Sequence, residues 1–449
     1  MKKLLPTLLL CLAISTQVIA QSGKITLKGT VKNDSFDEIS INTLNDRPLL
    51  TASLDDNSAF EIQGKIERGY YFLSYGRESA YLYLSPKDDL TVSFDATDMD
   101  STLKFSGKGS ERNNYLAKKF ILKSELTKDV ETFYSKDENV FLANLRSQKN
   151  QISSLLGTFQ VESFFKTDEK QSLDYDYLLN IQNYEQSLFY NIGEEINATA
   201  AFYKPLDAIN FRDLGDYNKD PFYRYLIDSH WRKRIDEQTS YEAMNKVYRS
   251  IRSNDLRVSM LINFFSKISS SKDKAQDYLK LIKENTSSQE FVDMAEKQYN
   301  TLSTLKSGDT SPNFTYKNIS GESVSLSDFL GKVVYIDVWA TWCAPCIKQI
   351  PYIKQLEKDF HGKDIVFVSI SVDKKEVFNK WERMVVAKNL TGVQLFADNS
   401  FESDFMNTYA VNSIPRFIII DRKGNIVDPD APSPSFEKTK GLLQSLLDK

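Results

Sequence analysis

The sequence contains few cysteines for its length. Its 449 residues include three, and Cys11 lies in the N-terminal apolar stretch. The other two, Cys343 and Cys346, are separated by two residues. Proteins that use disulfides as cross-links normally carry several, between distant positions. Because one bridge across so short a loop removes little entropy from the unfolded protein, we expect Cys343 and Cys346 to take part in chemistry.

The sequence also lacks a strong charge of either sign and long apolar runs. Its 57 Lys and Arg residues nearly balance 61 Asp and Glu residues, which gives a net charge of −4. No basic stripe predicts nucleic-acid binding, and no acidic block predicts a disordered tail. After the N-terminus no segment approaches the roughly eighteen apolar residues of a membrane span, so we expect a soluble mature protein.

The N-terminus has the pattern of a secretory signal peptide. Lys2-Lys3 supplies positive charge, residues 4–14 form an apolar run, and Val18-Ile19-Ala20 fits a cleavage site. The run is too short for a membrane anchor, and no small residue precedes Cys11 as a lipoprotein signal requires. We therefore expect a signal peptide over residues 1–20, cleavage after Ala20, and a location in the periplasm or cell envelope.

The length of the sequence predicts two to four domains. Over residues 24–107, short runs of alternating apolar and polar residues predict an all-β, sandwich-like domain. Over residues 111–305, Gly and Pro are scarce and the apolar spacing predicts a helical domain. One helix face is expected to carry Leu173, Tyr177, Ile181, Tyr184 and Leu188. After a linker at 306–312, strands and helices alternate and end in an antiparallel hairpin, which predicts an α/β domain over 308–449.

Cys343 and Cys346 stand where a predicted buried strand, residues 333–339, gives way to a predicted helix, residues 344–360. Unpaired N–H groups and the dipole at a helix N-terminus favour a thiolate. They lower a cysteine pKa from about 8.5 toward 7. Pro345 suits the first helical turn, because the N–H that it lacks would be unpaired there. We expect Cys343 to be the exposed attacking sulfur and Cys346 the more buried resolving sulfur.

Other uses of the pair are less well supported. A zinc site needs further ligands, and the only histidines, His230 and His361, stand in distant contexts. Haem attachment requires a histidine where Ile347 follows Cys346. A peroxidase would use a separate resolving cysteine, and an inert structural disulfide remains an alternative. We expect no metal and no cofactor.

Two further positions are candidates for the site. Asp337 lies six residues before Cys343 in an otherwise apolar strand. Burial would raise the pKa of its carboxyl and let it accept a proton from Cys346, unless the side chain points to solvent. Ile414-Pro415 precedes a predicted strand, and a cis bond there would turn the backbone toward the cysteines. Spacing alone is a weak argument, since most X–Pro bonds are trans.

Residues 308–449 resemble the TlpA/ResA-like family of the thioredoxin superfamily, thiol–disulfide oxidoreductases that act outside the cytoplasm. The matching stretches are residues 337–346, which read DVWATWCAPC, Pro351, and residues 411–415, which read VNSIP. The resemblance covers about a third of the sequence. Members from Bacteroidota with a strand-rich N-terminal domain followed by helices resemble the first 305 residues loosely.

The resemblance implies a role for each matching residue. Cys343 is expected to be the nucleophile, Cys346 the resolving thiol, Asp337 the buried proton acceptor and Pro415 a cis-proline. Trp342 and Ile414-Pro415 are expected to contact the substrate. Many relatives have Glu three residues after the second cysteine, where this protein has Gln349. Asp337 is therefore expected to carry the proton transfer alone.

The expected function is a periplasmic reductase or isomerase of protein disulfides, with a possible part in cytochrome c maturation. Its partners would be disulfide-containing exported proteins and a membrane thiol reductase of the DsbD or CcdA type. The alternative is an envelope binding or assembly protein whose first 305 residues do the main work, with an accessory redox domain. We expect a reductant, because Ala344-Pro345 adds no positive charge that would stabilise the Cys343 thiolate.

Overall fold

The computed structural model describes residues 22–34, 36–76, 78–192, 195–270, 272–303, 305–397 and 399–448. The expected signal peptide and Cys11 lie outside these residues. The protein divides into two compact units that interleave along the sequence. The first comprises Met1–Glu125, Asn150–Lys170 and Asn218–Pro221, and the second comprises Leu126–Lys149, Gln171–Tyr217 and Phe222–Lys449. No helix in the described ranges combines the length and apolar character needed to cross a bilayer.

The strand-rich region lies in the first unit. Its elements are β1 Gly23–Lys32, β2 Glu38–Asn42, β3 Pro48–Ser53, β4 Ala59–Ile66, β5 Gly69–Tyr75, β6 Glu78–Leu84, β7 Asp89–Asp95, α1 Met99–Thr102 and β8 Lys104–Lys108. They form two four-stranded sheets with the strand orders β4-β1-β7-β8 and β3-β2-β5-β6. One apolar cluster takes side chains from both, including Leu27 and Val92 from the first sheet and Ile41 and Leu73 from the second. The two sheets therefore share one core, as a sandwich does.

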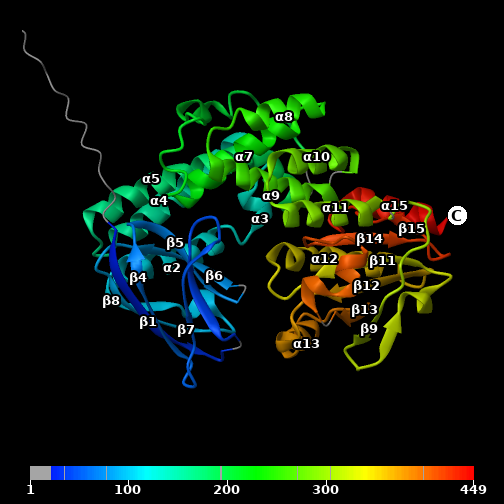
Figure 1. Ribbon diagram of the computed structural model, residues 1–449. Helices are drawn as coiled ribbons and strands as arrows, with labels where there is room; N and C mark the ends of the chain where they lie inside the picture. The colour runs from blue at the N-terminus through cyan, green and yellow to red at the C-terminus, as the bar shows by residue number, and fades with distance from the viewer. Residues whose placement is uncertain are drawn as a thin grey trace, which may run out of the picture. The chain divides into compact units, whose positions relative to one another are not determined.

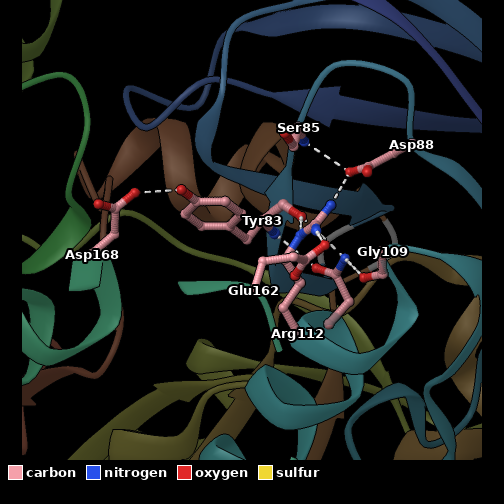
Figure 2. Close-up of polar contacts among 8 residues, drawn as sticks. Tyr83, Ser85, Asp88, Gly109, Arg112, Glu162 and Asp168 are labelled. Atoms are coloured by element: carbon pink, nitrogen blue, oxygen red, sulfur yellow. Dashed lines mark hydrogen bonds and ion pairs between the residues drawn. The ribbon is translucent and has the colours of Figure 1, made fainter. Parts of the chain in front are cut away.

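A buried ionic network joins helices to this sandwich. The Arg112 guanidinium in α2, Ser110–Leu126, forms ion pairs with Asp88 and Glu162 (Figure 2). The Tyr83 hydroxyl donates a hydrogen bond to Asp168 (Figure 2). The side chains of Arg112 and Asp88 are almost completely buried. Burial of ions is tolerated only where they are paired and hydrogen-bonded. The network therefore fixes α2 and the start of α5, Ser163–Gln182, to the loop that carries Asp88 and the strand that carries Tyr83.

The helical region follows β8, the last strand of the sandwich, in sequence (Figure 1). Its helices, with η for 3₁₀ helices, are α2 Ser110–Leu126, α3 Val130–Phe133, α4 Glu138–Gly157, α5 Ser163–Gln182, α6 Tyr184–Ile192, η1 Lys204–Ala208, α7 Pro221–Asp236, α8 Tyr241–Arg249, α9 Asn254–Ser270, η2 Lys272–Lys274, α10 Ala275–Asn285 and α11 Gln289–Ser303. The prediction of a single helix face over residues 173–188 is wrong in one respect. The helix breaks at Asn183, so that face is divided between α5 and α6. Ile181, Tyr184 and Leu188 still share one apolar cluster.

The C-terminal region alternates strands and helices. Its elements are β9 Thr315–Asn318, β10 Ser323–Ser325, η3 Leu326–Phe329, β11 Val333–Trp339, α12 Ala344–Asp359, β12 Ile365–Ser371, η4 Lys375–Val377, α13 Phe378–Ala387, β13 Val393–Phe396, η5 Ser400–Glu402, α14 Asp404–Thr408, β14 Arg416–Ile420, β15 Ile426–Asp428 and α15 Glu437–Leu447. They build a seven-stranded sheet with the order β10-β9-β13-β12-β11-β14-β15. Strands β11, β12 and β13 run parallel, and β14 and β15 form the predicted antiparallel hairpin. The predicted succession of a strand-rich, a helical and an α/β thioredoxin-like region is confirmed.

Strand β11 is the part of this sheet that positions the site. All seven of its residues are buried, as expected for an apolar strand covered on both faces. Tyr335 lies in one cluster with Ile353 and Leu356 of α12, so that helix covers one face of the strand. The opposite face contributes Ile336 and other residues to a second cluster. The backbone leaves β11 at Trp339 and enters α12 five residues later.

Candidate active site

The two cysteines form a disulfide at the start of α12. Cys343 is the N-cap residue, its Cα lies 5.2 Å from that of Cys346, and its Sγ accepts a hydrogen bond of 3.2 Å from the Cys346 N–H. Pro345 lies in the first helical turn, where its missing N–H costs nothing. In the reduced protein the same N–H would stabilise a thiolate on Cys343, since N–H groups at a helix N-terminus favour negative charge.

The expected difference in exposure between the two cysteines is not found. Cys343 is 3% exposed and Cys346 is 2% exposed. Both belong to the apolar cluster that includes Trp339 and Ala340. The sequence argument assumed that the first cysteine of the helix faces solvent, whereas the turn after β11 keeps it inside the cluster. Exposure therefore does not separate the two sulfurs, and the position of Cys343 at the helix cap is what distinguishes it.

Asp337 is buried in β11 and does not point to solvent. It shares a strand face with Tyr335, and that face is covered by α12, whose N-terminus holds the cysteines. Burial raises the pKa of the Asp337 carboxyl to about 7, the Ser369 hydroxyl lowers it, and nearby Glu357 raises it. Its Oδ1 atom has no hydrogen-bond partner among the described residues. A carboxyl of this kind can hold or release a proton near neutral pH.

The Ile414–Pro415 peptide bond is cis. Pro415 directly precedes β14, which pairs antiparallel with β11 so that Arg416 faces Val338. The start of β14 therefore lies at the end of β11 from which the cysteine loop emerges. Ile414 packs against the same cluster as Cys343. Trp342 also packs there, and its ring centroid lies 6.2 Å from that of Phe401 in η5.

Comparison with known proteins adds to this geometry. A family model described as Redoxin matches residues 306–443. The thiol-disulfide oxidoreductase ResA of Bacillus cereus is 28% identical over 142 residues, which are 32% of this protein and 79% of that one. The thioredoxin-like protein YneN of Bacillus subtilis (strain 168) is 34% identical over 125 residues, which are 28% of this protein and 71% of that one.

The protein belongs to the TlpA/ResA-like family of thiol–disulfide oxidoreductases. Residues 306–443, which the family model matches, form its ResA-like domain. The protein also matches a crystal structure from Bacteroides vulgatus, of a protein assigned as a thiol-disulfide oxidoreductase, at 37% identity. That match has a TM-score of 0.30 and covers 32% of this protein and 99% of the other. The family match and the similarity to ResA confirm the expected enzyme class, and they concern about a third of the sequence.

The ResA-like domain uses Gln349 structurally. This residue stands where many relatives have Glu, and its side chain is buried in α12. Its Oε1 atom accepts a hydrogen bond of 3.2 Å from the Ser435 N–H, which lies two residues before α15. An amide accepts this bond without carrying a charge. Gln349 therefore holds the segment before α15 in place and brings no carboxylate to the cysteines.

Sequence reasoning missed Asp373, which organises the loop before the cysteines. Its fully buried carboxylate accepts hydrogen bonds from the N–H and Oγ1 of Thr341, both at 2.9 Å, and from the Ser371 hydroxyl at 2.8 Å. Burial raises the pKa of this carboxyl, and the bonds from Thr341 and Ser371 lower it. The signal in the sequence is an acidic residue two positions after the end of an apolar strand, β12, that lies beside β11.

Proposed function

We propose that the protein is an exported reductase or isomerase of protein disulfides whose reaction takes place at Cys343 and Cys346. The observation that carries the proposal is the cysteine pair at the N-terminus of α12, next to the start of β14. The Cys343 thiolate attacks one sulfur of a substrate disulfide, and the other substrate sulfur leaves as a thiol after protonation. The Cys346 thiolate then attacks Cys343 Sγ and releases the second substrate thiol. Two electrons pass to the substrate, and the Cys343–Cys346 disulfide remains.

Asp337 supports the second step. Cys346 must lose its proton before it attacks, and a buried carboxylate with a pKa of about 7 accepts that proton at neutral pH. The carboxyl lies on the strand face covered by α12, the helix that carries Cys346. Gln349 stands where many relatives have Glu, so this position brings no second carboxyl that could accept the proton.

The direction of electron flow follows from the charges around Cys343. Ala344-Pro345 supplies no positive charge, and Asp337 adds negative charge, so only the helix terminus favours the thiolate. A weakly stabilised thiolate makes the dithiol a reductant. In an oxidising compartment outside the cytoplasm, such a protein needs a membrane thiol reductase of the DsbD or CcdA type to restore Cys343 and Cys346. Disulfide-containing exported proteins, including those of cytochrome c maturation, are its proposed substrates.

The trapping of substrates tests the proposal. In the Cys346→Ala variant the resolving thiol is missing, so mixed disulfides through Cys343 should accumulate. They should appear on non-reducing gels of cell extracts and disappear with dithiothreitol. The Cys343→Ala variant is the matched control and should trap nothing. Equal trapping by Cys343→Ala, with none by Cys346→Ala, would reverse the two roles.

A further inference from the structure

A pocket of about 300 Å³ lies within the second unit, between two helices and the segment that leads into Pro415. One wall comes from α9 and α11 of the helical region. The other comes from η5, α14 and residues 410–412 of the ResA-like domain. The lining residues that matter here are Phe265, Met294 and Lys297 on the helical side and Phe401, Val411 and Asn412 on the other. Neither region forms this pocket alone.

Two residues that line the pocket connect it to the surroundings of the proposed redox site. Phe401 belongs to its lining and also contacts Trp342, the residue directly before Cys343. Asn412 lies two residues before Ile414 and is joined to the end of α9, because the Ser269 hydroxyl lies 2.7 Å from the Asn412 Oδ1 atom. Phe401 and Asn412 therefore connect the pocket to Trp342 and to the segment before Pro415.

The Asn412 amide has an unused end at the pocket. Its Nδ2 atom is buried and has no hydrogen-bond partner in the described part of the protein. The Ser269 hydroxyl also lies 3.0 Å from the Ser266 carbonyl, so the amide fits in either orientation. In both orientations Ser269 binds one end and the other end lacks a partner. A buried polar group without a partner is costly, and a backbone carbonyl or N–H of an extended peptide would satisfy it.

The rest of the lining favours an apolar side chain with an acidic neighbour. Phe265, Met294 and Val411 present apolar surface, and Met294 is 50% exposed on α11. An exposed Met on a concave surface adapts to side chains of different shapes. Lys297, one helical turn after Met294, is also exposed and places a positive charge at the pocket.

We propose that this pocket binds the substrate polypeptide next to the cysteine that Cys343 attacks. A large apolar side chain, one to three residues from that cysteine, occupies the space beside Met294. The Asn412 amide pairs with the substrate backbone, and Lys297 favours an acidic residue. The preferred substrates are thus extended or unfolded polypeptides with an apolar, acidic sequence beside the cysteine. This inference rests on the proposed function and adds to it the choice of substrate.

The test compares peptide disulfides with a small disulfide. The full reduced protein is given bis(2-hydroxyethyl) disulfide, or synthetic peptides with one cysteine linked to glutathione. The peptides carry Leu or Ser at each of the three positions on either side of the cysteine, with Glu or Lys outside them. At the best position, kcat/KM for the Leu peptide should exceed that for the Ser peptide about tenfold, which is about 1.4 kcal/mol. The small disulfide does not reach the pocket.

Three variants connect the preference to the pocket. Met294→Glu should abolish the preference for Leu, whereas Ile262→Glu, at a similarly exposed apolar residue of α9 outside the lining, should keep it. Lys297→Glu should reverse the preference between Glu and Lys peptides. All three should reduce the small disulfide at the wild-type rate. Equal rates for Leu and Ser peptides, or equal effects of Met294→Glu and Ile262→Glu, would overturn this inference alone. Failure of the wild-type protein to reduce the small disulfide would overturn the proposed function and this inference with it.

Discussion

Replacing Asp337 by Asn should stabilise the protein and slow its redox reaction. Burial in β11 raises the pKa of the Asp337 carboxyl from 3.8 to about 7, because the ionised form is poorly solvated there. A pKa unit is worth roughly 1.4 kcal/mol, so a rise of about three units disfavours the ionised folded state by about 4 kcal/mol. Asn has nearly the same shape and cannot ionise, so the variant avoids this cost.

The stabilisation should grow as the pH rises. Below about pH 4 the Asp337 carboxyl is protonated in both the folded and the unfolded protein, so Asp and Asn differ little. As the pH rises to about 7, the unfolded protein releases the proton while the folded protein keeps it, and the free energy of unfolding of the wild type falls. Above that pH both states are ionised and the full cost of about 4 kcal/mol is present.

Calorimetry of the full oxidised protein at pH 4.5 and 8.5 measures this difference. A gain of 1 kcal/mol raises the Tm of a domain of this size by about 2–4 °C. The transition of the ResA-like domain should therefore rise by about 8–16 °C at pH 8.5. At pH 4.5 it should rise by only about 2–4 °C, because the unfolded carboxyl is already largely ionised there and the cost is about 1 kcal/mol. Asp364→Asn is the control, since its side chain is 70% exposed. An unchanged or lower Tm of Asp337→Asn at pH 8.5 would refute the reasoning. Unchanged reduction rates between pH 6 and 9 would remove Asp337 from the mechanism.

Three further predictions concern the site and the sandwich. Asp373→Ala should lower the free energy of unfolding by about 2–4 kcal/mol in urea denaturation, because buried donors of Thr341 lose their acceptor; a wild-type midpoint would contradict this. Arg112→Ala should lower the free energy of unfolding by about 3–5 kcal/mol, because Asp88 is left buried without its cation. If urea denaturation gives a loss below about 1 kcal/mol, water or another cation replaces the Arg112 guanidinium. Equilibration with glutathione and dithiothreitol should give the Cys343–Cys346 pair a potential near −270 mV, about that of thioredoxin. A value above about −180 mV would argue against a reductase.

The elements closest to the chemistry could be predicted from the sequence. Strand β11, Val333–Trp339, has the predicted bounds, because a strand buried on both faces is a continuous apolar run between polar residues. The start of α12 was predicted as well, since Pro345 and the cysteine spacing mark the first helical turn. These are local signals, carried by residues a few positions apart.

Features that depend on packing were predicted less well. The apolar spacing over residues 173–188 indicated one helix, because spacing continues across a break when both helices face the same core. The expected exposure of Cys343 failed for a similar reason. A helix N-terminus is a local property, whereas exposure depends on how Trp339, Ala340 and the rest of the cluster surround the sulfur.

The pocket beside the redox site could not have been predicted from any local pattern. The hydrogen bond between Ser269 and Asn412 joins residues 143 positions apart, and neither is unusual where it stands. The family match begins at residue 306, so the residues that carry the cysteine chemistry do not include α9 or α11. Because α9 and α11 line the pocket that Asn412 borders, two residues before Ile414, we propose that they contribute to the choice of the polypeptide that Cys343 attacks.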